Sequence, residues 1–148
     1  MYELEILEAI AERLEARGIG EWDSDANYGA AGPLAAIYVR MVPETARSVI
    51  TLSPYPVTVA LSPNDSILGL QVRTRTPGRD PRTTDQLDGA ILGVLHGLRN
   101  VELGGHRVTK ILFQSGDSMG QDGSGRWSRS SNYYITGPRW EGEPWLTR

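Results

Sequence analysis

Helical periodicity is scarce in this chain, and that scarcity limits the folds it can adopt. Apolar residues recur at helical spacing in two stretches, one from Leu4 to Leu14 and one from Pro81 to Leu98. Several other stretches alternate between apolar and polar residues or are rich in β-branched ones. Two helices cannot supply a crossover for every strand, so the sheet should be antiparallel or mixed. The sequence therefore predicts an α+β fold, with two helices packed on a mixed, mostly antiparallel sheet of short strands.

The two predicted helices have recognisable ends. The first should end at Gly18, because glycine readily takes the left-handed conformation of a helix terminus. For the second, Asp80 is a suitable N-cap, Pro81 a suitable first residue and Asn100 a suitable end. The positions expected to be buried are Leu4, Leu7, Ile10, Ala11 and Leu14 in the first helix, and Leu87, Ala90, Ile91, Val94, Leu95 and Leu98 in the second.

Glycine and proline divide the rest of the chain. Gly104-Gly105 predicts a tight hairpin turn, and the polar stretches 18–32 and 115–125 are expected to be loops. The segment Ser53–Pro56 should interrupt a strand, since proline cannot donate to a ladder. Gly89, Gly93 and Gly97 lie on one side of the second helix, which predicts close approach of another backbone. The expected strands are residues 34–39, 48–52, 57–61, 67–76, 101–103, 106–114 and 126–136.

A length of 148 residues predicts one domain, which we place at residues 1–137. Residues 138–148 carry Trp140 and Trp145 among Glu, Gly and Pro, and this composition predicts an extended C-terminal arm. These tryptophans have no local core in the sequence, so they should dock either on their own domain or on a partner.

The chain lacks the usual signals of catalysis. It has no cysteine, which excludes disulfides and thiolate metal sites, and neither histidine has ligand or base spacing. The loop between Asp117 and Asp122 lacks the spacing of a calcium loop. These observations predict a protein without enzymatic activity, cofactor or metal. No signal peptide or membrane-length apolar run is present, so we expect a cytoplasmic protein that does not bind a membrane.

The densest basic feature is a group of arginines from residue 73 to residue 82. It could contact phosphates or an acidic neighbouring subunit, although a solvated strand end and loop, with the strand running out to solvent at Arg73 and Arg75, is the favoured explanation. A small nucleic-acid-binding module is thus an alternative, although the net charge of −3 does not favour it. A hydrolase using Asp117 or Asp122 with His106 is a further alternative. The candidate subunit-interface residues are Arg73, Arg75, Arg79, Arg82, Asp117, Asp122, Arg126, Trp140 and Trp145.

One long segment is similar to a known family. The sequence ILGVLHGLRNVELGGHR, residues 91–107, resembles the helix–hairpin segment of the phage minor capsid and tail terminator family. The preceding strand LQVRTR, residues 70–75, resembles the strand that leads into that helix, and residues 114–117 resemble its Gln-Ser-Asp loop. The proline-rich segment 53–63 and the tryptophan-bearing arm depart from the family pattern.

The resemblance implies a tail-terminator-like fold and a structural virion protein. Such a protein forms a ring of six subunits that ends the tail tube and then binds the head-side connector or stopper. DNA passes through the ring without sequence-specific binding. The expected location is the tail–neck junction of the virion, after assembly in the cytoplasm of the host bacterium. The nearest alternative within this class is a head-completion or stopper protein of the neck.

Overall fold

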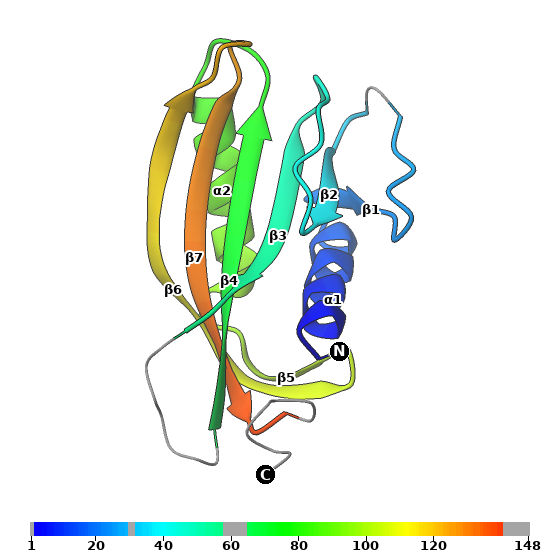
Figure 1. The fold of residues 1–148 in the computed structure, drawn as a ribbon, viewed down its shortest axis with the longest axis vertical. Helices are drawn as coiled ribbons and strands as arrows, with labels where there is room; N and C mark the ends of the chain where they lie inside the picture. Colours follow the sequence, from blue (N-terminus) through cyan, green and yellow to red (C-terminus); the bar gives the residue numbers. More distant parts are fainter. Residues whose placement is uncertain (1, 30–31, 58–64, 141–148) are drawn as a thin grey trace.

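The computed structural model describes residues 2–29, 32–57 and 65–140 (Figure 1). Within these ranges, seven strands form one sheet in the order β1-β2-β3-β4-β7-β6-β5. The pairs β1–β2 and β2–β3 are parallel, and the other neighbours are antiparallel. The elements are α1 (Tyr2–Ala16), β1 (Gly20–Trp22), β2 (Ala35–Val39), β3 (Val49–Tyr55), β4 (Asp65–Thr76), α2 (Arg82–Leu95), β5 (Arg99–Leu103), β6 (His106–Gln121) and β7 (Trp127–Pro138).

The predicted α+β fold on a sheet of short strands is wrong. The two helices and the mixed sheet are present, but the molecule is mostly a curled sheet whose longest strands, β4, β6 and β7, have 12, 16 and 12 residues (Figure 1). Residues 115–121, expected to be loop, continue β6 because β7 pairs with them as far as Gln121. Ladder hydrogen bonds thus offset the poor strand propensity of Gly and Ser. Bulges between Phe113 and Ser115 and between Ser118 and Gly120 interrupt this pairing.

Two further corrections concern β1 and β3. Gly20–Trp22 was expected to be loop but forms β1, which pairs with β2. β3 continues through Pro54, which pairs with Leu70 of β4. The pairing of β2 with β3 ends at Leu52, so one side of β3 is open at Pro54 among the described residues, and the missing N–H disrupts no ladder there. The strand expected at 57–61 lies largely outside the described residues.

Both helices pack into one apolar core. α1 contacts β1, β2 and β3, whereas α2 contacts β4, β6 and β7. Most of the predicted positions are buried, but Leu4 is 37% exposed and Ala90 is also exposed, while the buried face of α2 includes Thr84 and Asp88. The core cluster contains Ile6, Leu7, Ile10 and Leu14 of α1, Ile91 and Leu95 of α2, and strand residues such as Ile37, Ile50, Leu70, Val72, Val108, Ile111, Tyr133 and Ile135.

The helix ends agree in part with expectation. Gly18 has φ +74° directly after α1, as predicted. α2 begins at Arg82, and its N-cap is Pro81 instead of the predicted Asp80. The backbone N–H of Arg82 still donates to Oδ1 of Asp80 at 3.0 Å, one residue before the cap. α2 ends at Leu95, before the predicted Asn100, which lies in β5 with φ +51°. No described helix is long and apolar enough to cross a bilayer.

Of two predictions about glycines, one is confirmed and one is wrong. The hairpin turn at Gly104-Gly105 is confirmed, with Leu103 opposite His106 and φ values of +61° and +83°. A Cβ at Gly104 would lie 2.4 Å from the backbone oxygen of Glu5, so this turn packs tightly on α1. The close backbone approach predicted for Gly89, Gly93 and Gly97 is absent from the described structure, since a Cβ at each would meet nothing within 4 Å.

Candidate subunit-interface site

The β6–β7 turn lies at the top of Figure 1. Charged residues from three segments line a pocket at this end of the molecule. β4 ends there at Thr76, the segment after β2 passes beside it, and the β6–β7 turn closes over both. This arrangement brings together Arg73, Arg75, Asp122 and Arg126, four of the nine predicted interface residues, around a pocket of about 290 Å³. We call this hollow the arginine pocket; Val42, Glu44 and Met119 also line it.

Arg75 forms the buried part of the arginine pocket. The prediction that β4 runs out to solvent here is wrong, because Arg75 is only 7% exposed and the following Thr76 only 1%. Nη2 of Arg75 donates to the backbone oxygen of Pro43, but its Nε has no partner among the described residues. Burial, and then repulsion from Arg126, lower the pKa of the Arg75 guanidinium from its usual value. A buried cation with unused donors is costly, so this position favours an acceptor arriving from outside.

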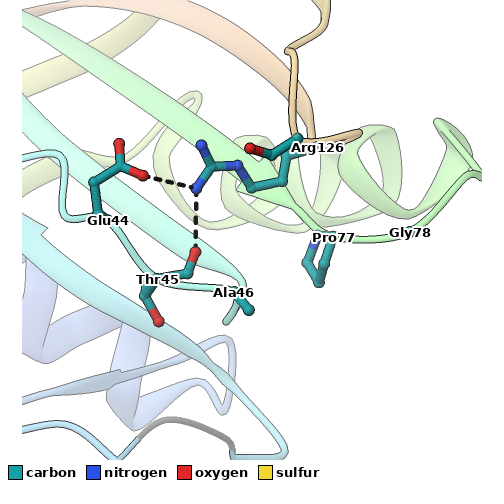
Figure 2. A pocket seen from close by; sticks show the side chains of 7 residues that line it. Glu44, Thr45, Ala46, Pro77, Gly78 and Arg126 are labelled. Atoms are coloured by element: carbon teal, nitrogen blue, oxygen red, sulfur yellow. Dashed lines mark hydrogen bonds and ion pairs between the residues drawn. The ribbon is translucent and has the colours of Figure 1, made fainter.

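Arg126 separates the arginine pocket from a second hollow of about 380 Å³. Figure 2 shows its guanidinium directed toward Glu44 and the backbone of Thr45, which lie 3.5 and 3.3 Å from Nη1. Its Nε is 2.8 Å from Oδ2 of Asp122, and the backbone N–H groups of Ser124 and Arg126 donate to Oδ1 of the same carboxylate. The hydrogen bond from the backbone N–H of Arg126 is the largest cause that lowers the pKa of Asp122. The turn residues therefore neutralise Arg126 locally.

Arg73 lies at the rim of the arginine pocket and has no acidic partner among the described residues. Its Nη2 is 3.3 Å from the sulfur of Met119, which belongs to β6. Met119 is 50% exposed and Val42 is 45% exposed, so exposed apolar side chains line the same pocket. The pocket can thus accept an anion next to an apolar group.

The other predicted interface residues lie outside this pocket. Arg82 pairs with Asp80 two residues earlier, and their side chains are 81% and 49% exposed. Arg79 is exposed, and its backbone oxygen accepts a hydrogen bond from Trp127 at 3.2 Å. Asp117 is exposed on β6 opposite Ser130 of β7. Trp145 lies outside the described residues.

Trp140 docks on the core of its own domain, the first of the two outcomes that the sequence left open. It is 3% exposed and stacks on Tyr2 at 5.5 Å between ring centroids. Its Nε1 donates to the backbone oxygen of Arg107 at 2.9 Å, and its backbone N–H donates to the hydroxyl of Ser66 at 3.2 Å. The chain is therefore anchored on its own domain up to this residue.

The geometry does not assemble the hydrolase alternative. His106 is the first residue of β6 and Asp122 directly follows its last, so the length of the strand separates them. His106 instead lies 3.4 Å from Oε1 of Glu5, and this hydrogen bond is the largest cause that lowers the pKa of Glu5. Among the described residues, no three His, Asp or Glu side chains are grouped so that they could hold a metal ion.

Two buried polar groups were not predicted from the sequence. Arg47, with a side chain 3% exposed, pairs with Glu21 and donates to the backbone oxygen of Leu34. Asp88 of α2, with a side chain 8% exposed, pairs with Arg129 of β7. Asp88 was detectable in principle, because it lies one turn from Ile91 on the buried face of α2. Nothing in the local sequence marks Arg47.

Comparisons with known proteins give a consistent result. A family model described as bacteriophage tail terminator protein matches residues 13–138. A chain from the virion of a native gene transfer agent particle is similar in fold, with a TM-score of 0.61 at 14% identity over 90% of this chain and 96% of that one. A second solved chain, at the same identity and coverage, has a TM-score of 0.48, too low to support an argument. No curated protein matches the sequence.

Proposed function

This chain belongs to the family of bacteriophage tail terminator proteins, and on that premise we propose that it is the subunit of a closed ring, expected to be hexameric, that caps the tail tube and joins it to the head-side connector. A structural role in the phage tail follows from the family itself. The observation that supports the finer proposal is the family match over residues 13–138, which includes α2, the end of α1 and the whole described sheet from β1 to β7. The role needs no catalytic step and no cofactor.

The open sheet supports ring formation. Its two edges differ, because β1 has three residues and β5 has five, and they are at opposite ends of the strand order. A ring built by rotation joins two different surfaces of the same subunit, so unlike edges suit it. The arginine pocket adds a surface of definite charge at the end of the strands.

The proposed ring would lie at the tail–neck junction as a minor component of the virion, after assembly in the host cytoplasm. DNA would pass through its lumen without base-specific contacts. The partners in this proposal are the tail tube protein on one face and the connector or stopper on the other. The family match names a terminator, so a head-completion role is the second choice.

Electron microscopy of the purified chain mixed with its tail tubes tests the proposal. We expect the purified chain to form rings by itself. When it is mixed with tail tubes, one ring should bind at a single end of each tube, and the tubes should stop growing in length. Mass photometry of the chain alone should give six times the subunit mass. A chain that stays monomeric and leaves tube growth unchanged would refute the proposal.

A further inference from the structure

Three arginines and two acids, Glu44 and Asp122, line the arginine pocket. Arg73 and Arg75 make no ion pair with any acid in the described part of the chain, and their contacts are a sulfur atom and a backbone oxygen. Arg126 beside them is already paired with Asp122 at 2.8 Å. The chain as a whole carries a formal charge of −3, so this pocket is a positive point on an acidic protein. Such a point attracts carboxylates of a second copy.

The rim of the pocket specifies the chemistry of its ligand further. Val42 and Met119 are the exposed apolar side chains that line it, and Met119 contacts Arg73. A ligand that fits should carry a carboxylate and, within a few residues, a large apolar side chain. An arginine plane and a thioether both pack well against an indole ring.

We propose that the arginine pocket binds residues 141–147 of a second copy of this chain, with the carboxylates of Glu141 and Glu143 on Arg73 and Arg75 and the indole of Trp145 on the rim. The segment has the sequence EGEPWLT, in which two acids stand within four residues before the apolar pair Trp145-Leu146. The inference rests on the proposed ring, because a neighbouring copy must supply the segment. Charge complementarity and the available length of chain select this occupant.

The length of chain prevents the segment from reaching its own pocket. Trp140 is held at Ser66, near the start of β4, and Arg73 lies seven residues farther along that strand. Seven strand residues span about 23 Å. Glu143 follows Trp140 by three residues, which reach at most about 11 Å. The guanidinium of Arg73 lies farther still, since it contacts Met119, toward the β6–β7 turn.

The two sites also lie on different faces of the sheet. Trp140 belongs to the core cluster and stacks on Tyr2 of α1, so it is on the face that the helices cover. Leu70 and Val72 of β4 point into the same core. Arg73 and Arg75 occupy the alternate positions of β4 and therefore point to the other face. If Trp140 of a second copy lies near this pocket, neither the length of the segment nor the face of the sheet prevents binding.

Fluorescence anisotropy of a labelled EGEPWLT peptide tests the contact directly. The protein is the full chain carrying Glu141→Gln and Glu143→Gln, so that its own tail does not compete. We expect saturable binding that weakens about tenfold with Arg73→Gln, the loss typical of one charge-assisted hydrogen-bond partner. Arg79→Gln, an exposed arginine outside the pocket, is the matched control and should leave the affinity unchanged. A peptide with both acids changed to Gln should bind about tenfold more weakly as well.

Cross-linking in the assembled full chain tests whether the contact joins two copies. A photoreactive phenylalanine replaces Trp145, and light and heavy isotope-labelled copies are mixed before assembly. Cross-links from residue 145 of one isotope form to Val42 or Met119 of the other are expected. Cross-links confined to one copy would overturn the proposal.

The outcomes separate this inference from the proposed function. If rings form at tube ends but Arg73→Gln does not change the affinity for the peptide, the proposed tail contact is wrong and the proposed ring is supported. Pocket-dependent peptide binding by a chain that never caps tubes would support the contact and refute the ring. If Arg73→Gln weakens binding of a short DNA duplex but not of the peptide, the pocket binds nucleic acid and the tail contact is wrong.

Discussion

Arg129 of β7 donates from Nε to a carboxylate oxygen of Asp88 in α2 at 3.0 Å, and this ion pair ties α2 to the centre of the sheet. The hydroxyl of Ser131 donates to the other oxygen of Asp88 at 2.8 Å. The Asp88 side chain is 8% exposed, so its charge is tolerated only while both partners are in place. Asp85, one turn earlier, reaches the same arginine at 3.6 Å but is 58% exposed.

Replacing Asp88 should therefore be far more costly than replacing Asp85. We expect Asp88→Ala to lower the free energy of unfolding by about 3 kcal/mol, because Arg129 loses its buried partner. Asp85→Ala should change it by less than about 1 kcal/mol, as for other exposed pairs. Urea unfolding of both variants measures the difference, and equal effects would show that the pair does not hold α2.

Trp140 is predicted to act as an anchor of the fold. Trp140→Ala should lower the free energy of unfolding by about 3–5 kcal/mol, since it leaves a cavity beside Tyr2 and frees the backbone oxygen of Arg107. Trp127, which is partly exposed, is the control, and its change to Ala should cost clearly less. A melting temperature that stays the same for Trp140→Ala would mean that this residue is not part of the folded core.

The two turn glycines should respond differently to the same substitution. A Cβ at Gly104 would lie 2.4 Å from a backbone oxygen of α1, so Gly104→Ala forces the hairpin and the helix apart. A Cβ at Gly105 would meet no atom within 4 Å, so Gly105→Ala should lower the free energy of unfolding only by the backbone strain of its positive φ, about 1 kcal/mol. Thermal unfolding should rank Gly104→Ala well below Gly105→Ala; the reverse order would contradict the close packing.

At Gly89, on the exposed face of α2, the same substitution should stabilise the protein. A Cβ there meets nothing within 4 Å, and alanine stabilises a helix interior by about 1 kcal/mol relative to glycine. Gly89→Ala should raise the melting temperature of the isolated subunit. A lower melting temperature would contradict the open space beside Gly89.

The pair of Glu5 and His106 predicts a pH dependence. The hydrogen bond from His106 lowers the pKa of Glu5 in the folded protein, so its contribution to stability is present at neutral pH and is lost as the pH falls through the folded pKa. Carbon-13 NMR titration should show a pKa for Glu5 below the usual glutamate value, and His106→Ala should raise it. An unchanged Glu5 titration in that variant would exclude the interaction.

Local pattern was enough to predict some of these elements. The apolar spacing of α1 and the Gly104-Gly105 turn depend on neighbouring residues alone, and both are confirmed. The extension of β6 through polar residues could not be predicted, because β7 supplies its ladder. Pairing across the sheet likewise carries β3 through Pro54.

The site follows the same division. The clustering of arginines in the sequence identified Arg73 and Arg75 as candidates. The solvent exposure predicted for Arg75 was wrong, because Pro43, which is 32 residues away in the sequence, contacts its guanidinium. The place of Asp88 on the buried face of α2 could have been predicted, but its pairing with Arg129, 41 residues away, could not. Charge density therefore located the candidate residues, and only the fold distinguished the buried, unpaired cation from the exposed ones.

The position of β7 has a consequence for synthesis on the ribosome. β7 lies between β4 and β6, yet it follows every other described strand in the chain. Until it emerges, β4 and β6 each present an unpaired edge toward the place it will occupy, and a partial sheet with open edges is prone to wrong association. Insertion of β7 closes the gap and brings in both Tyr133 and Arg129, the partner of Asp88. A nascent chain therefore becomes competent to assemble only after β7 has left the ribosome.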